Sequence, residues 1–110
     1  MGTFFSPLIA EREGKDWTLH ASLHFWSNTL NEMLIVPRGF ITDFASVPRI
    51  PLAFWLAGDT AHASAVIHDY LLSLKYSRPL AAEVFREAMI AEGVPAWRRW
   101  LMYNAVRWPV

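Results

Sequence analysis

The spacing of the hydrophobic residues changes after the first third of the chain, and this change limits the folds that the chain can adopt. Apolar and polar residues alternate from Trp17 to Trp26, which predicts a half-buried antiparallel strand because successive strand side chains point to opposite faces. The apolar run 33–37 follows a polar, turn-prone segment, so the two runs predict a hairpin that ends at Pro37. Residues 39–42 continue as a short strand or extended segment, and beyond them the apolar spacing becomes helical.

Proline and glycine mark the ends of the predicted helices. Pro79 and Pro95 each suit a first helical turn, where the missing N–H costs no hydrogen bond, and Gly93 suits the left-handed residue that closes a helix. The helices expected on these grounds cover residues 52–56, 61–74, 79–92 and 96–107. The sequence therefore predicts one α+β domain over residues 1–110, in which an N-terminal antiparallel β-hairpin or small sheet precedes a cluster of three or four helices.

The composition excludes several classes of protein. Hydrophobic residues make up 54% of the chain and charged residues 18%, which is typical of a folded chain rather than a disordered one. Ten basic and ten acidic residues give a net charge of zero, so the chain lacks the excess positive charge with which proteins bind nucleic acids. The chain has no Cys, and its apolar stretch 63–74 is too short for a membrane span and contains His68 and Asp69. We therefore expect no nucleic-acid partner, no membrane association and no bound cofactor or metal.

The aromatic content favours a binding surface. Six Trp, seven Phe and three Tyr in a chain without net charge predict an exposed apolar patch, and such patches mark docking surfaces. We expect a protein partner, or an oligomer of the chain. Trp97, Trp100, Leu101 and Trp108 predict that the last helix packs into the core or against that partner.

His68 and Asp69 are the first candidate site residues. On the helix 61–74, His68 shares its face with small residues and is expected to point inward, whereas Asp69 lies about 100° further round the helix. Asp43 and Ser46 lie at the junction between a strand and a helix, where they are placed to converge with His68. A catalytic set of these four residues is one hypothesis. In the structural alternative, Asp43 forms an Asx-turn and Ser46 caps a helix. His68 and Asp69 then make structural hydrogen bonds, and both alternatives stay open.

A second candidate site follows one side of the last helix. Arg99, Tyr103 and Arg107 are spaced at i, i+4 and i+8, so they form a stripe that could bind an anion or form an ion pair with Asp43 or Asp69. In the alternative interpretation, the stripe is a solvated face beside buried tryptophans.

Three sequence blocks resemble a known family. They read GFITDFASVPR over 39–49, AVIHDYL over 65–71 and MYNAVR over 102–107. Together they are similar to the signature blocks of a small bacteriophage and prophage family of unassigned activity, the domain-of-unknown-function family 1353. Members usually carry an aspartate where this chain has Ala82, and Glu83 is the residue that could replace it. The resemblance implies phage origin, and a location in the host cytoplasm or the virion.

Three functions remain open from the sequence. The first expectation is a small phage accessory protein that acts through protein–protein contacts, associated with the virion or its assembly, with a phage or host protein as partner. The second is a small hydrolase in which His68 is the general base, oriented by Asp69 or Asp43. Water or Ser46 is then the nucleophile. In a variant of this hypothesis, a metal ion assists the reaction. The third is an inhibitor of a host enzyme or defence complex.

Overall fold

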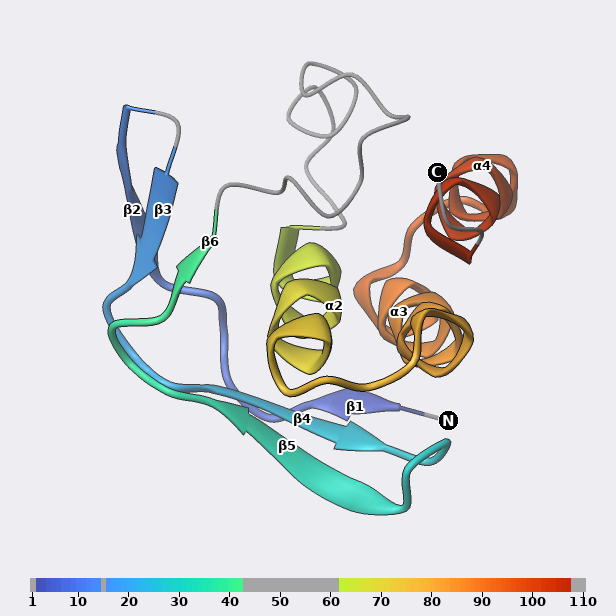
Figure 1. Cartoon of the computed structure of the whole chain (residues 1–110), viewed down its shortest axis with the longest axis horizontal. Coiled ribbons are helices and arrows are strands. Elements are labelled where there is room, and N and C mark those ends of the chain that lie inside the picture. The colour runs from blue at the N-terminus through green and yellow to red at the C-terminus, as the bar shows by residue number, and fades with distance from the viewer. Residues whose placement is uncertain (1, 15, 43–61, 108–110) are drawn as a thin grey trace.

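The structure of the protein is a computed structural model that describes residues 2–14, 16–42 and 62–107. In chain order, its elements are β1 (Thr3–Phe4), β2 (Ala10–Glu13), β3 (Asp16–Leu19), β4 (Leu23–Ser27), β5 (Glu32–Val36), β6 (Ile41–Thr42), α2 (His62–Ser73), α3 (Arg78–Glu92) and α4 (Ala96–Arg107) (Figure 1). Strands precede helices, so the fold is α+β, as the sequence predicts. The helix expected over 52–56 lies outside the described residues, as do Asp43, Ser46 and Trp108.

The described strands form two antiparallel sheets, with the orders β1-β4-β5 and β2-β3-β6. Strands β4 and β5 form a hairpin whose register runs from the Leu23–Val36 pair to the Ser27–Glu32 pair. Pro37 directly follows the last residue of β5. The predicted hairpin is therefore confirmed for residues 23–36, and β6 confirms the short strand predicted after it.

The prediction of one continuous strand from Trp17 to Trp26 is wrong. The chain leaves the β2-β3-β6 sheet after Leu19 and enters the β1-β4-β5 sheet at Leu23. At the break, the N–H of His20 donates to the Ile9 carbonyl at 2.8 Å. Three residues separate the two strands, so odd-numbered side chains still point inward on both, and Leu19, Leu23 and Phe25 are all buried. Alternation alone therefore did not reveal the change of partner strand.

The helix ends lie within one residue of those predicted for the described helices. The side chain of Ser77 accepts a hydrogen bond from the Leu80 N–H at 3.3 Å, which caps α3, and Pro79 lies in the first turn. Gly93 has φ 81° and closes the same helix in the left-handed conformation.

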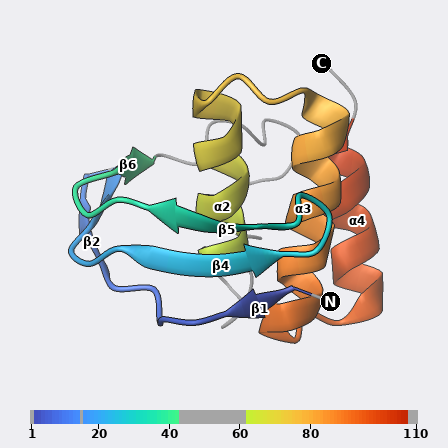
Figure 2. The ribbon, with the colours of Figure 1, turned by 90° about the horizontal axis from the view of Figure 1, so that it is seen from below.

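Helices α2 and α3 cover one face of the β1-β4-β5 sheet, and α4 packs on α3 (Figures 1 and 2). The core lies between this sheet and the two helices. Large buried side chains come from both the sheet and the helices. They include Phe25 and Leu23 of β4, Ile67 and Leu71 of α2, and Phe85 and Met89 of α3.

Of the two alternatives predicted for the last helix, packing of its tryptophans into the core is wrong for the described ones, and packing against a partner stays a prediction. Trp97 is 64% exposed, Trp100 is 65% exposed and Leu101 is 44% exposed. The face of α4 that packs on α3 instead carries Met102, Val106 and the partly apolar side chain of Arg98. These three positions repeat every four residues and form one narrow stripe, which leaves the bulky indole rings outside.

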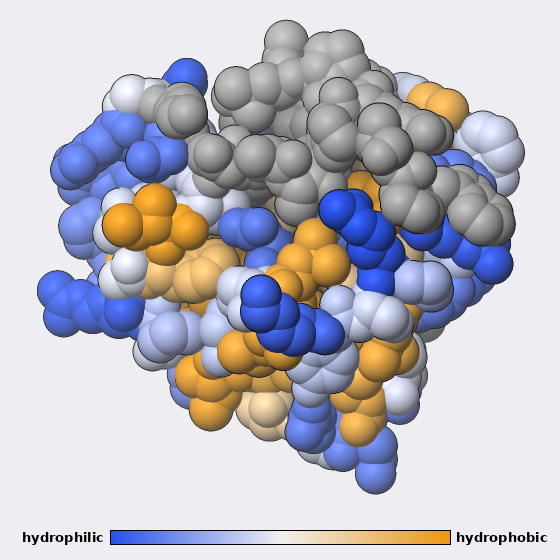
Figure 3. Space-filling model, in the orientation of Figure 1, coloured by the Kyte–Doolittle hydropathy of each residue, from blue (hydrophilic) through white to orange (hydrophobic). Residues whose placement is uncertain are grey.

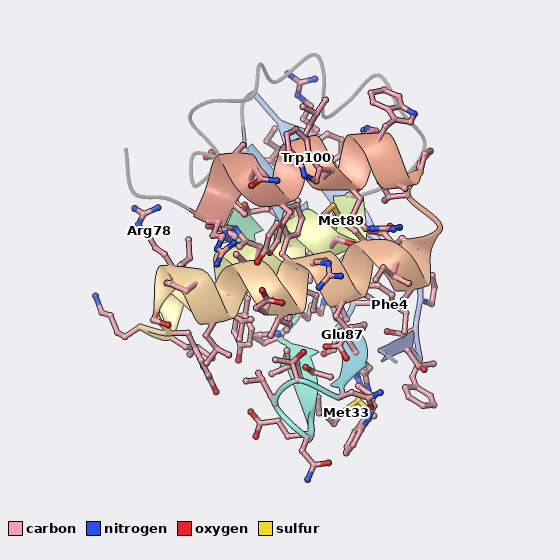
Figure 4. All side chains as sticks on the ribbon, turned by 90° about the vertical axis from the view of Figure 1, so that its right-hand side faces the viewer. Phe4, Met33, Arg78, Glu87, Met89 and Trp100 are labelled. Atoms are coloured by element: carbon pink, nitrogen blue, oxygen red, sulfur yellow. The ribbon has the colours of Figure 1, made fainter. Side chains whose placement is uncertain are left out.

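Glu87 joins α3 to the turn of the β4-β5 hairpin. Its two carboxylate oxygens accept hydrogen bonds from the Ser27 hydroxyl at 2.8 Å and from the Asn28 backbone N–H at 2.7 Å. Ser27 in turn accepts a hydrogen bond from the Leu30 N–H at 3.1 Å. Figure 4 shows Glu87 on the side of α3 that faces the strands, with Met33 of the hairpin beyond it. The turn is therefore fixed by a helix that follows it by about sixty residues.

Replacement of Glu87 by alanine is expected to lower the free energy of unfolding by about 1–3 kcal/mol, because the Ser27 hydroxyl and the Asn28 N–H both lose their acceptor. Urea denaturation measures the change. Glu13→Ala is the matched control, since Glu13 lies exposed on β2. Equal stability of the two variants would show that the contact between α3 and the hairpin turn contributes nothing.

Candidate functional site

His68 lies inside the core of the protein. Only 1% of its surface is exposed, and its ring packs against Phe85 of α3 with 5.1 Å between the ring centroids. Burial, with a smaller contribution from the charge of Arg78, lowers the pKa of His68 to about 4. The imidazole is therefore neutral at pH 7 and closed off from solvent, as its place among small residues on the helix predicts.

The other predicted partners of His68 are placed only in part. Asp69 is partly buried on α2, while Asp43 and Ser46 lie outside the described residues. The next residue on the helix, Tyr70, packs edge-on against Phe40 with 5.5 Å between the ring centroids. The chain three residues before Asp43 thus lies beside the helix that carries Asp69. Convergence of the four residues on one site, and with it the hydrolase hypothesis, stays a prediction.

Arg99, Tyr103 and Arg107 line one surface pocket of about 390 Å³. Their spacing of four residues places them along one edge of α4. Helix α3 packs beside that edge and adds Arg86 to the pocket wall. Figure 4 shows the two helices side by side, with Trp100 on α4. The remaining lining residues are Ala96, Trp100 and Asn104.

Glu83 of α3 contacts two of the residues that line this pocket. It accepts a hydrogen bond from the Tyr103 hydroxyl, and its second carboxylate oxygen lies 3.7 Å from a guanidinium nitrogen of Arg86. The hydrogen bond to Glu83, together with burial and the negative charge, raises the pKa of Tyr103. The phenol therefore stays protonated and holds its ring in place. The Arg86 and Arg107 guanidiniums lie 5.9 and 5.6 Å from the centre of that ring.

Arg99 is held from its other side. One of its guanidinium nitrogens donates to the Val94 carbonyl at 3.2 Å, near the end of the turn that joins α3 to α4. The side chain is partly buried. The pocket is thus lined by three guanidiniums, two aromatic rings and one amide, which are groups that bind carboxylates or phosphates.

Sequence reasoning found one wall of this pocket and missed the other. Trp100 and Asn104 form an i, i+4 stripe next to Arg99 and Tyr103, so the helical spacing could have identified them. Arg86 has no such local signal, because it comes from another helix. Glu83, the residue that could replace the missing family aspartate, contacts Tyr103 and Arg86.

A second pocket, of about 400 Å³, lies between the N-terminal segment and the ends of α2 and α3. Its polar members include His62 and Glu92. One oxygen of Glu92 accepts hydrogen bonds from the Ser64 backbone N–H at 2.7 Å and the Ser64 hydroxyl at 2.5 Å. The carboxylate thereby satisfies a donor of the first turn of α2, which is a structural role.

Within the described ranges, no three His, Asp or Glu side chains lie close enough together to hold a metal ion. Among the helices of those ranges, none has the length and hydropathy needed to cross a membrane.

Comparison with known families gives a match over most of the chain. The model of a family described as proteins of unknown function, DUF1353, matches residues 17–106. The chain belongs to this family. The buried His68 and the lining residues of the pocket from Arg86 to Asn104 fall within the part that the DUF1353 model covers, and Arg107 lies one residue beyond it. A search of curated proteins found no significant match, and a search of solved structures found none either.

The buried His68 predicts that acid destabilises the protein. Below the ordinary pKa of 6.5, His68 binds a proton in the unfolded chain, whereas in the folded chain it stays neutral down to about pH 4. The contribution of neutral His68 to the free energy of unfolding is therefore fully present above pH 6.5. It is lost between pH 6.5 and 4, and the loss is roughly 3 kcal/mol. Urea denaturation across this range measures the loss. His68→Gln should remove this component, and the exposed control His20→Gln should retain it.

An equal acid-induced loss in wild type and His68→Gln would contradict this assignment. Should His68→Gln not fold, NMR titration of the imidazole in the wild-type protein is the second measurement. The ring is expected to stay neutral at pH 5.

Proposed function

We propose that this protein acts by binding another protein through the outer face of α4. The observation that carries the proposal is the exposure of Trp97, Trp100 and Leu101 together on one helix. Tryptophan, tyrosine and arginine are the residues most enriched at the energetic centres of protein interfaces. On α4 all three types occur side by side.

The other exposed apolar side chains of the described residues contain no tryptophan. Met33 and Ile35 share the strand β5, while Phe5, Ile9, Ile41 and Leu74 lie on separate segments. Figure 3 shows apolar side chains on the face that it presents as separate patches between polar ones. Exposed apolar residues of this kind are ordinary on protein surfaces, whereas two neighbouring indoles on one helix are not.

The burial of His68 supports a binding role further. A general base must reach the proton that it removes, and 1% exposure leaves no approach to the imidazole. A pKa of about 4 also makes His68 a weak base at neutral pH. The guanidiniums and indole rings on the surface of α3 and α4 are exposed to a partner, whereas the imidazole of His68 is not.

Phage origin is part of the proposal, on the family resemblance. The protein is then an accessory protein of the virion or its assembly, in the host cytoplasm or on the virion. An inhibitor of a host enzyme or defence complex would use the same surface, and identification of the partner separates these two roles.

The test places a photoreactive amino acid, benzoylphenylalanine, at position 100 in the cells that naturally contain the protein. We expect one discrete crosslinked product, which mass spectrometry identifies. The purified partner should then bind wild type at least about tenfold more tightly than the Trp97→Ser/Trp100→Ser variant, as measured by calorimetry. Both variant positions are exposed, so the melting temperature should hold.

Ile35→Ser is the matched control, because Ile35 is 48% exposed on the strand β5 and lies away from α4. It should bind the partner as wild type does. No discrete product at position 100, or wild-type affinity of the double tryptophan variant, would refute the proposed function.

A further inference from the structure

We propose that the pocket between α3 and α4 binds the carboxylate side chains of an acidic protein segment, with the Trp100 ring packing against the apolar part of that segment. This inference rests on the proposed function and names the chemistry of the partner. It is carried by the described residues that line the pocket, which come from two helices and whose charged members are all arginines.

The described lining of the pocket is basic. It includes Arg86, Arg99 and Arg107, and none of the lining residues that the structure describes is acidic. The carboxylate found beside it, Glu83, is engaged by the Tyr103 hydroxyl and by Arg86. Among the described residues, Glu83 is thus shared with Arg86, whereas Arg99 donates its hydrogen bond to a neutral backbone carbonyl, so the positive charge of Arg99 faces the pocket. An acidic ligand would complement that charge.

The arginines are also held in place, which favours a defined ligand geometry. Arg99 donates to the Val94 carbonyl, and the guanidiniums of Arg86 and Arg107 lie over the Tyr103 ring. A guanidinium that lies against an aromatic ring keeps N–H groups at its edge, and this edge matches the two oxygens of a carboxylate. Because the side chains are already positioned, little conformational entropy is lost when the ligand binds.

A protein segment fits the surroundings better than a nucleic acid does. The whole chain has no net charge, whereas nucleic-acid binding depends on many basic residues along a phosphate backbone. Next to the arginines lie the exposed rings of Trp97 and Trp100. A segment in which acidic residues flank an apolar one would use both features at once. The pocket volume of about 390 Å³ is within the range of small-ligand sites, so it accommodates side chains rather than a folded domain.

The test uses full-length ¹⁵N-labelled protein and a short acetylated peptide in which glutamates flank a central leucine. NMR titration should shift the Trp100 indole and the Asn104 side-chain amide. The pair of Trp26 and Asn28 is the internal control, because it offers the same two groups on the sheet, where the Trp26 indole donates to the Asn28 oxygen at 2.7 Å. Its signals should not move. The glutamine counterpart of the peptide should bind at least about tenfold more weakly.

Substitutions then assign the binding to the pocket. Arg107→Gln and Arg99→Gln should each weaken binding of the glutamate peptide about tenfold or more. Arg12→Gln is the control of equal charge change, since Arg12 also lies over an aromatic ring, that of Trp17, on β2 and β3. It should leave the affinity unchanged. Arg107 is exposed, so its variant keeps the test valid even if Arg99→Gln does not fold.

The possible outcomes separate this inference from the proposed function. Equal binding of the glutamate and glutamine peptides, equal effects of Arg12→Gln and Arg107→Gln, or no binding of the peptide would overturn the acidic-segment proposal. Tighter binding of a single-stranded oligonucleotide at the same Trp100 and Asn104 signals would overturn it as well. If the partner crosslinked at position 100 depends on Trp97 and Trp100 but tolerates Arg107→Gln, the proposed function stands and this inference fails.

Discussion

Helix α3 has to be covered on three sides, and the rest of the fold follows from that requirement. Its fully buried positions are Ala81, Ala82, Val84, Phe85, Ala88 and Met89. Three of the six are alanines, which let neighbouring backbones approach closely, and α2, α4 and the strands all pack against this helix. Two of its carboxylates also bind neighbouring elements. Glu87 binds the turn of the β4-β5 hairpin, and Glu92 binds Ser64 in the first turn of α2. One helix therefore supplies both the apolar surface and the polar contacts that fix its neighbours.

This arrangement decides which polar residues are available for chemistry. The side of α2 that packs on α3 carries His68 into contact with Phe85, where burial keeps the imidazole neutral. Helix α2, whose His68 and Asp69 are the first candidate site residues of the sequence, thus contributes mainly to the core. The arginine-lined pocket lies on the side of α3 that packs on α4, where Arg86 and Glu83 meet Tyr103.

Local signals in the sequence were sufficient for the helices and insufficient for the sheets. The Ser77 cap and Gly93 act on their own helix, so the ends of α3 could be predicted to within one residue. Strand pairing is non-local: β2 carries only exposed or partly exposed residues and exists because it pairs with β3. The break between β3 and β4 preserves the alternation of buried residues, so no periodic pattern could show it.

The same distinction applies to the candidate site. Arg99, Tyr103 and Arg107 share an edge of one helix, and the sequence could therefore group them. Arg86 joins them only through the packing of α3 on α4, which depends on which stripe of α4 is buried. Hydrophobicity alone favours the tryptophans as that stripe. The structure selects Arg98, Met102 and Val106 instead, because side chains without wide rings fit between two closely packed helices.

Helix α4 therefore differs from the other described helices in what it leaves exposed. Of the described elements it packs mainly on α3, so a single stripe of its surface is buried. Two indole rings and a leucine then remain exposed to water. The folded chain therefore lacks the stabilisation that their burial would give, about 25 cal/mol for each Å² of apolar surface. Had stability alone shaped this face, polar residues would serve it better than tryptophan. This composition supports the proposed binding of another protein, and the arginines of the adjoining pocket support the proposal that the bound segment is acidic.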